Sequence, residues 1–415
     1  MRQIISRLLT RSQKYTKTDM KYLAKGGFWI SISYFIQVAI GVISTVALAN
    51  LLPKESLGAY QYILSIAGIL SVFTLSGLGT AITRAVAQGH DGALRSGVRT
   101  KLKWSVGIVI TSGIVASYYL LNDDMTLGLS FLIVGACAPI IESSKLYLNF
   151  LYGKEAFRDS VLLGAWRKPL PLIALIATLL FTDSVLILIF VYFISNAISY
   201  VAVYFTIIKK YNPPLESNNE AISYAKHLTM FRILGTFSNN VDKVLLWHFL
   251  GPVSVANFTI AQMATKYSIG TFSSVNTLIL PKLTRRDLPT LQKTLHYKVF
   301  LFTIMMACGA VVYVFLVPIL FKYVFPGYLD SIVLTQLMAV SFLFVPRDIY
   351  SKALTAHKQI KSQYIMSIVI PIIKIILLFT LIVFYGIWGA IYAIIATDFI
   401  SALATYYFFK RAKSV

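Results

Sequence analysis

The sequence predicts an all-α polytopic membrane protein, and three observations support this. The chain has 415 residues, of which 57% are hydrophobic and only 13% charged, and its mean hydropathy is +0.73. Soluble domains are nearer half apolar and a quarter charged. Apolar stretches long enough to cross a bilayer recur along the whole chain, and basic residues gather in alternate connections between them. At about 20 residues per span, this length allows roughly twelve transmembrane helices and no sizeable soluble domain.

The apolar stretches define twelve expected spans. They lie near residues 28–50, 58–82, 104–121, 126–151, 160–181, 185–208, 227–250, 254–280, 295–320, 331–352, 364–384 and 388–409. Residues 1–25 combine apolar with basic side chains, which suits either a short amphipathic helix on a membrane surface or a basic tail. No small-residue cleavage site precedes the first long apolar stretch, so we expect no cleaved signal peptide.

The distribution of lysine and arginine predicts the orientation. With a cytoplasmic N-terminus, the inside segments hold 28 of the 38 basic residues, eight lie within spans, and the outside connections hold only Lys54 and Lys322. Cytoplasmic loops of membrane proteins carry such an excess, so we expect both termini in the cytoplasm. The net charge of +22 is then mostly a topology signal, and we expect no nucleic-acid partner.

An internal repeat divides the chain into two halves. A shift of 198 residues places LLPKESLGAY (51–60) on FLGPVSVANF (249–258), and a shift of 202 places Pro169 on Pro371. Six spans per half is an even number, so the sequence predicts two parallel six-helix lobes around a central cavity. The expected organisation is a basic cytoplasmic segment (1–27), an N-lobe (28–208), a cytoplasmic linker (209–226), a C-lobe (227–409) and a cytoplasmic tail (410–415).

The seventh expected span, within 226–250, carries an unusual number of polar residues. Arg232, Gly235, Asn239 and Asp242 are spaced by three, four and three residues, which places them on one face of a helix. A charge at mid-bilayer costs about 2.5–3.5 kcal/mol even on lenient scales, so this face must meet other helices or a water-filled cavity. Shifted by 198, the stripe falls on uncharged residues of the first span, among them Tyr34 and Gln37.

Ionisable residues inside the other spans complete the set of candidates, because such residues usually mark a substrate or ion pathway. The candidates for a substrate cavity are Arg232, Lys266, Asn239, Asn240, Lys243, Gln37, Tyr34 and Lys374. The candidates for ion coupling or gating are Asp242, Asp398 and Glu142.

Several of these residues have two possible roles. Lys374 and Asp398 lie at similar depth on consecutive spans, so they form either a structural ion pair or part of a cavity. Glu142 and Lys145, three residues apart, are placed to neutralise each other. Asp242 either pairs with a neighbouring lysine or titrates during ion coupling.

Motifs for ATP hydrolysis, zinc binding and serine hydrolysis are absent from the sequence. Cys137 and Cys308 both lie within apolar spans, which suits packing thiols better than a disulfide framework. Asp123 and Asp124 are adjacent in a short outside connection and suit a solvated turn. We therefore expect no cofactor, no metal site and no enzymatic activity.

Two segments carry a family resemblance. LANLLPKESLGAYQYILSIAGILSVFTLSGLGTAITR (48–84), and NNVDKVLLWHFLGPVSVANFTIAQM (239–263) followed by LPKL (280–283), resemble the Wzx-like O-antigen and polysaccharide flippases. These belong to the multidrug/oligosaccharidyl-lipid/polysaccharide (MOP) exporter superfamily, which has a MATE-like fold. Lipid II flippases of the same superfamily resemble the chain less, because its first span has no charge between Lys25 and Lys54.

The resemblance implies a flippase that moves an undecaprenyl-diphosphate-linked oligosaccharide, such as an O-antigen repeat unit, from the inner to the outer leaflet of the bacterial inner membrane by alternating access. It implies H⁺ or Na⁺ as coupling ion, and a polysaccharide polymerase and a chain-length regulator as partners besides membrane lipids. A cationic cavity suits this substrate, because arginine and lysine bind phosphates.

Two other classes of function compete with a flippase. A multidrug or cation antiporter of the same fold would favour an acidic or aromatic cavity, whereas cations predominate among the candidates. A polysaccharide polymerase or ligase would need a large outside loop, and the longest outside connection has about ten residues, around 321–330.

Overall fold

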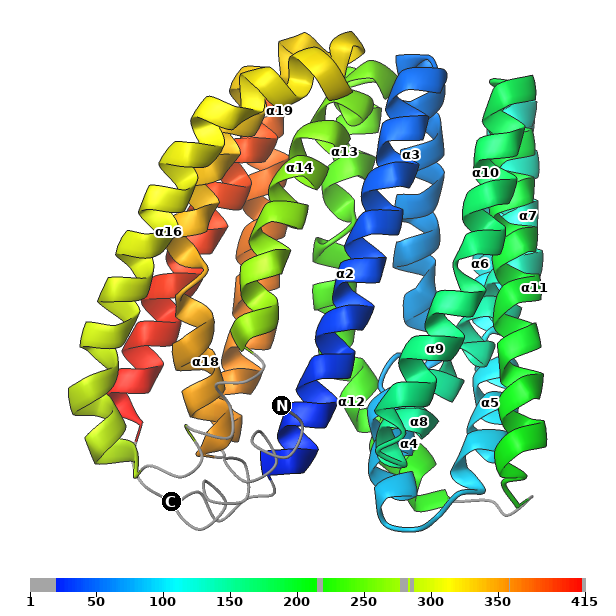
Figure 1. Cartoon of the computed structure of the whole chain (residues 1–415). Coiled ribbons are helices and arrows are strands. Elements are labelled where there is room, and N and C mark those ends of the chain that lie inside the picture. Colours follow the sequence, from blue (N-terminus) through cyan, green and yellow to red (C-terminus); the bar gives the residue numbers. More distant parts are fainter. Residues whose placement is uncertain (1–19, 215–218, 277–282, 284–286, 358, 413–415) are drawn as a thin grey trace, which may run out of the picture.

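The computed structural model describes residues 20–214, 219–276, 283, 287–357 and 359–412. Within these ranges the ordered elements are all helical. Figure 1 shows the helices standing side by side, with their connections at the two ends of the bundle. In chain order the elements are α2 (Met20–Leu51), α3 (Lys54–Leu70), η1 (Ser71–Thr74), α4 (Leu78–Ala87), α5 (Ala93–Trp104), α6 (Val106–Leu121), α7 (Met125–Ser144), α8 (Leu146–Gly153), α9 (Phe157–Arg167), α10 (Pro169–Phe181), α11 (Val185–Tyr211), α12 (Asn219–Ser238), α13 (Val241–Leu250), α14 (Pro252–Asn276), α16 (Leu288–Val324), η2 (Pro326–Ser331), α17 (Ile332–Met338), η3 (Ala339–Phe344), α18 (Arg347–Ala356) and α19 (Ile360–Arg411).

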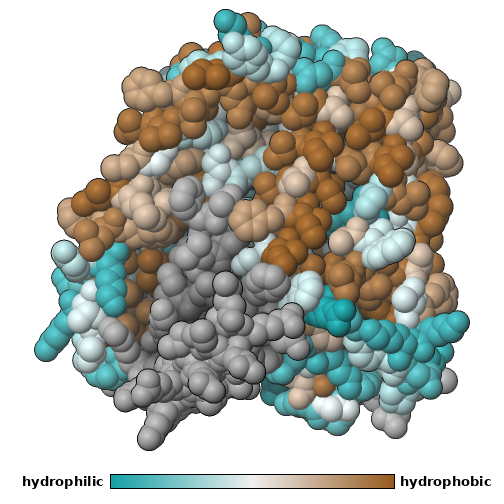
Figure 2. Space-filling model, viewed as in Figure 1, coloured by the Kyte–Doolittle hydropathy of each residue, from teal (hydrophilic) through white to brown (hydrophobic). Residues whose placement is uncertain are grey.

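The exterior of the bundle is suited to lipid. Nine stretches of the described chain are long and apolar enough to cross a membrane. One of them, α19, turns back at Gly386, whose φ of 58° is left-handed, and so supplies two crossings. Large apolar side chains such as Leu121 (85%) and Phe181 (90%) are exposed on the outside. Figure 2 shows an apolar band between two polar ends. These findings confirm the predicted all-α polytopic membrane fold.

The two halves share one core and also have cores of their own. Residues from both halves, including Tyr60 of α3 and Ile260 of α14, form one apolar cluster. Near the lower end of the view in Figure 1, α4, α5 and α8 form a first-half cluster, whereas α16 and α18 contribute to a separate second-half cluster. We call this lower end the open end and the other the closed end. Apolar burial therefore joins the halves mainly toward the closed end.

Close packing of α3 against α13 and α14 carries this junction. A Cβ atom on Gly58 would lie 2.0 Å from the carbonyl oxygen of Pro252, so only glycine allows this approach. The rings of Tyr62 and Trp247 stack with their centroids 4.6 Å apart. These contacts cross from one half to the other, and they define how closely the halves can approach at this end.

Several expected spans are broken helices. The second breaks after η1, where Leu75 has a left-handed φ of 54°, and the fourth breaks at Lys145 between α7 and α8. The prediction of one continuous helix over 227–250 is wrong, because α12 ends at Ser238 and α13 begins at Val241. The side-chain amide of Asn240 donates to the carbonyl of Thr236 (2.8 Å), which satisfies a group that the break frees. Breaks inside a membrane are tolerated where freed backbone groups find such partners.

The expected cytoplasmic connections are more helical than predicted. Residues 93–104, placed in a loop, form α5, whose apolar side chains Leu94 and Val98 are buried four residues apart. Within the expected linker 209–226, α11 continues to Tyr211 and α12 begins at Asn219. Most of the expected basic segment 1–27 lies outside the described residues.

Candidate substrate cavities between the two halves

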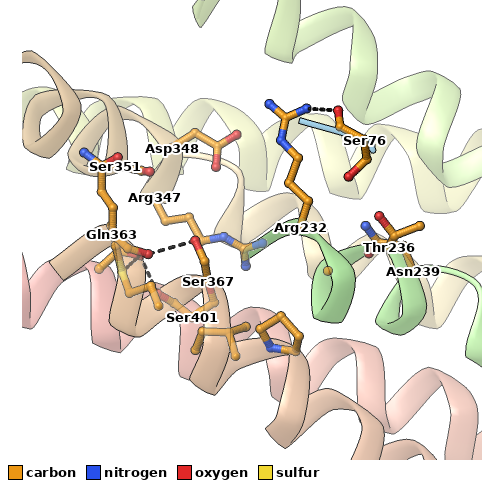
Figure 3. Close-up of a pocket in the computed structure, with 15 residues that line it drawn as sticks. Ser76, Arg232, Thr236, Asn239, Arg347, Asp348, Ser351, Gln363, Ser367 and Ser401 are labelled. Atoms are coloured by element: carbon orange, nitrogen blue, oxygen red, sulfur yellow. Dashed lines mark hydrogen bonds between the residues drawn. The ribbon is translucent and has the colours of Figure 1, made fainter. Parts of the chain in front are cut away.

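A cavity of about 650 Å³ is lined mainly by the second-half helices α12, α18 and α19, and by Ser76 of the first half. We call it the C-cavity. Figure 3 shows polar side chains of α12, α18 and α19 arranged around a common space. Its lining residues are Ser76, Arg232, Gly235, Thr236, Asn239, Arg347, Asp348, Ser351, Gln363, Met366, Ser367, Ile370, Pro371, Ser401 and Thr405. Hydroxyl and amide groups are the most numerous polar groups on this wall, which therefore offers many neutral donors and acceptors.

Arg232 connects this cavity with the broken second span. Its guanidinium group donates to the carbonyl oxygen of Ser76 (3.1 Å) and to the hydroxyl of Thr80 (2.9 Å). One turn earlier on α12, the hydroxyl of Thr229 accepts a hydrogen bond from the backbone N–H of Gly77 (3.0 Å). The break near Leu75 leaves backbone groups without helical partners, and α12 supplies partners for two of them. Arg232 thus lines the cavity and also holds the two halves together.

Arg347 and Asp398 form an ion pair beside the C-cavity, with Nη1 and Oδ1 2.9 Å apart. Arg347 also donates to the backbone carbonyl of Asp398 (2.8 Å). The proposed ion pair of Asp398 with Lys374 is therefore wrong. Arg347 begins α18 after the η3 turn, and this break turns its side chain toward α19. Arg347 was not among the candidate residues predicted from the sequence.

A second cavity of about 380 Å³ lies among first-half helices; we call it the N-cavity. Its lining residues are Leu64, Ala67, Gly68, Ser71, Ala138, Ile141, Glu142, Lys145, Tyr192, Phe193, Asn196, Tyr200, Thr236 and Asn240. Thr236 belongs to both linings, and the consecutive residues Asn239 and Asn240 face the C-cavity and the N-cavity respectively. The break between α12 and α13 therefore stands where the two cavities adjoin.

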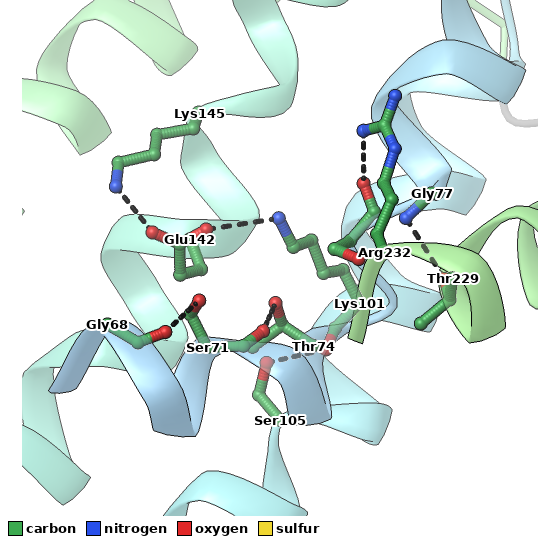
Figure 4. A network of polar contacts seen from close by, with 11 residues as sticks. Gly68, Ser71, Thr74, Gly77, Lys101, Ser105, Glu142, Lys145, Thr229 and Arg232 are labelled. Carbon is green, nitrogen blue, oxygen red and sulfur yellow. Dashed lines mark hydrogen bonds and ion pairs between the residues drawn. The ribbon is translucent and has the colours of Figure 1, made fainter. Parts of the chain in front are cut away.

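An ionic cluster borders the N-cavity. Figure 4 shows Lys101 and Lys145 reaching Glu142 from two sides. The Lys101 Nζ atom is 3.3 Å from one carboxylate oxygen, and Lys145 contacts the other. Nearby, the guanidinium carbon of Arg167 lies 3.8 Å from the ring centroid of Tyr200. The predicted contact of Glu142 with Lys145 is present, and Lys101 was not anticipated because α5 had been placed in a loop.

Asp242 lies away from both cavity linings. It is 1% exposed, and its carboxylate accepts from the side-chain amide of Gln262 (3.1 Å), which in turn accepts from Lys266 (2.8 Å). The Lys243 ammonium instead reaches Gln61 in the first half (3.0 Å). The break after Asn239 rotates α13 relative to α12, so the predicted stripe does not continue from Arg232 to Asp242.

The remaining candidates lie outside both linings. Gln37 accepts a hydrogen bond from Lys168 (3.4 Å), and Tyr34 packs with its hydroxyl oxygen against Gly270. Lys374 is half-buried and near enough to Lys266 for their charges to interact. The structure thus gathers Arg232, Asn239, Asn240 and Glu142 around the adjoining cavities, and distributes the other candidates over neighbouring contacts.

The internal repeat contains a signal for the residues that were missed. The same shift of 202 that relates Pro169 to Pro371 also relates Lys145 to Arg347 and Asn196 to Asp398. In each half, a cation at the break of the fourth span lies near a polar residue on the sixth span. The two cavities are therefore built at equivalent positions of the repeat.

Comparison with known proteins agrees with this architecture. Residues 23–286 match the family described as polysaccharide biosynthesis protein, which is more than half of the chain. The chain belongs to this family. Among curated proteins, this family member is 23% identical over 366 residues to an uncharacterized membrane protein of Methanocaldococcus jannaschii, covering 77% of the chain and 70% of that protein.

Solved structures of other proteins share the fold of this chain. An inward-facing MATE multidrug transporter of the MOP superfamily aligns with a TM-score of 0.74 at 15% identity, over 90% of this chain and 94% of that one. An outward-facing structure of such a transporter aligns with a TM-score of 0.69 at 14% identity, over 94% of both chains. A MOP transporter from Pyrococcus furiosus, described as having a binding pocket of reversed polarity, aligns with a TM-score of 0.66 at 17% identity, over 94% and 95%. The predicted MATE-like fold is therefore confirmed, and the family match agrees with the resemblance to polysaccharide flippases.

Proposed function

We propose that this protein is a flippase that carries a lipid-linked oligosaccharide with a diphosphate group across the bacterial inner membrane. The observation that carries the proposal is the pair of adjoining cavities between the halves. One has a wall rich in hydroxyl and amide groups, and the other borders a cluster with more cations than carboxylates. Hydroxyl and amide groups suit sugars, and lysine and arginine suit phosphates. A substrate that joins both chemistries matches both cavities at once.

The sizes of the cavities agree with this substrate class. Ligand cavities commonly span about 300–1,000 Å³, and each cavity falls in that range. Because both are lined by groups from more than one helix, a change in the relative position of the halves would change their shape. Alternating access, with the closed end of this structure facing outward, follows from the expected orientation.

A multidrug or cation antiporter is the alternative with the same fold. The C-cavity contains Asp348, but Arg232 and Arg347 lie on the same wall, and Arg347 is paired with Asp398. The C-cavity therefore offers a cationic substrate no net negative charge, and the cluster beside the N-cavity has more cations than carboxylates. This charge distribution favours an anionic substrate.

The proposal assigns roles to the candidate residues. Arg232, Asn239 and Asn240 contact substrate, and Lys243, Lys266, Gln37, Tyr34 and Lys374 shape the helices around it. Asp242, Asp398 and Glu142 take part in gating or in coupling to H⁺ or Na⁺. A polysaccharide polymerase and a chain-length regulator would receive the product at the outer face. Both termini lie in the cytoplasm in this proposal, and O-antigen is one candidate glycan.

Transport can be tested with the full chain in proteoliposomes. A fluorescent polyprenyl-diphosphate disaccharide is placed in both leaflets, and a membrane-impermeant reductant measures how much probe becomes accessible. We expect the protein to accelerate exchange of this probe and not of a fluorescent phosphatidylcholine. Active transport of a cationic dye, without exchange of the saccharide lipid, would support the antiporter and contradict the proposal.

A further inference from the structure

We propose that the N-cavity is the phosphate site of this protein, and that Glu142 occupies it as an internal competitor when no substrate is bound. This places the anionic part of the substrate in the first half, whereas the cationic candidates for the substrate cavity that the sequence predicted, Arg232, Lys243, Lys266 and Lys374, all lie in the second half. The inference deepens the proposed function and rests on it only for the identity of the lipid that carries the phosphate.

The charges around the N-cavity do not cancel. Lys101, Lys145 and Arg167 lie within one cluster, and Glu142 is its one carboxylate among the described residues that line the cavity or contact this cluster. Arg167 belongs to none of the ion pairs formed by the described residues, and its Nε atom is buried without a hydrogen-bond partner there. A cluster with two uncompensated positive charges inside the membrane attracts an anion.

The C-cavity differs in this respect. Arg347 is matched by Asp398 at 2.9 Å, and Arg232 spends its donors on Ser76 and Thr80. Asp348 adds a negative charge to the same wall. The C-cavity is therefore close to neutral, and its hydroxyl and amide groups suit the sugar part of the same substrate.

The positions of the lysines allow an exchange of partners. Lys145 is 42% exposed on its side chain and borders the cavity, whereas Lys101 is 7% exposed and approaches Glu142 from behind. Lys145 can therefore turn from Glu142 to a phosphate while Lys101 keeps the carboxylate neutralised. Tyr200, with Arg167 and Lys145 both near its ring face, holds the second cation beside the same space.

Binding of inorganic pyrophosphate to the full chain in phosphatidylcholine nanodiscs tests the site. We expect K145Q to weaken binding at least tenfold, because the Glu142–Lys101 pair survives and no cation is left to turn. Lys103, two residues after Lys101 and exposed, supplies the matched control, and K103Q should bind like the unchanged protein. E142Q should bind more tightly at neutral pH, because the competing carboxylate charge is gone and Lys145 is free to contact the anion. E142Q removes the counter-ion of Lys101 and so can fail to fold. In that case the comparison of K145Q with K103Q alone tests the site.

Equal binding by K145Q and the unchanged protein, or equal losses in K145Q and K103Q, would overturn the site. Nanodiscs with phosphatidylglycerol distinguish the source of the phosphate: competition with pyrophosphate would show that membrane lipids also enter the site. The saccharide-lipid exchange assay separates the two proposals. Exchange without specific pyrophosphate binding would support the flippase function and refute this site. Specific binding without exchange would support the site and refute the flippase function.

Discussion

Substituting Gly58 by alanine should open the closed end of the bundle. The new Cβ atom would lie 2.0 Å from the carbonyl oxygen of Pro252, whereas ordinary van der Waals contacts begin near 3.4 Å. The obstacle is backbone, which cannot rotate away as a side chain could, so α3 and α14 must separate by roughly 1–1.5 Å. Overpacking of this kind costs about 1–3 kcal/mol, which corresponds to a shift of about 5- to 150-fold away from the closed arrangement.

Spin-label distance measurements can detect this shift. Cys137 and Cys308 are first replaced by serine. Single cysteines are then placed at Asp123, in the connection between α6 and α7, and at Tyr385, beside the turn of α19. We expect one short distance distribution in the reference protein and a second, longer one in Gly58→Ala. Gly113→Ala is the matched control, because nothing lies within 4 Å of the Cβ that it would add. Identical distributions in both variants would refute the reasoning.

Three further predictions concern single contacts. Trp247→Ala removes the stack with Tyr62 and should lengthen the same spin-label distance. Tyr62→Phe should leave this distance unchanged, because the hydrogen-bond partner of Tyr62, Tyr119 (2.6 Å), lies in the same half. It should lower the free energy of unfolding by about 0.5–1.5 kcal/mol. Asp398→Asn and Arg347→Gln should each destabilise the protein by about 1–3 kcal/mol, and the double variant by less than the sum; additive losses in a double-mutant cycle would contradict a direct pair. Arg232→Ala should abolish saccharide-lipid exchange while the protein stays inserted. Arg232→Lys should restore little exchange, because a single ammonium group lacks the forked donors that contact Ser76 and Thr80 together. Normal exchange in both variants would contradict a role for Arg232.

Features that depend on local sequence were predicted well. The membrane class and the helical fold follow from hydropathy, which each stretch of chain expresses independently of the others. Arg232 and Asn239 were selected because placing polar groups in a lipid-facing helix is costly. Both line the C-cavity, and their contact with substrate stays a prediction.

Features that depend on tertiary pairing were not predicted. Asp398 pairs with Arg347, 51 positions away, whereas an ion pair with Lys374 was one of the two roles predicted from their similar depth. Lys101 was not predicted as a site residue, because the five basic residues in 83–103 indicated a loop. The segment instead forms α5, which buries Leu94 and Val98 on one face. The orientation of Asp242 depended on a helix break that apolar periodicity alone does not reveal.

The break between α12 and α13 has a consequence for how the protein can move. Ala225, on the lower part of α12, belongs to the first-half core, whereas Val241 and Leu246 of α13 belong to a second-half core. A continuous helix packed into both cores would resist rotation of one core relative to the other. Asn239 and Asn240 interrupt this helix, and the side-chain amide of Asn240 donates a hydrogen bond to the carbonyl of Thr236. We therefore expect the seventh span to act as a hinge where the two cavities adjoin. In that case α12 would move with the first-half core and α13 with the second-half core.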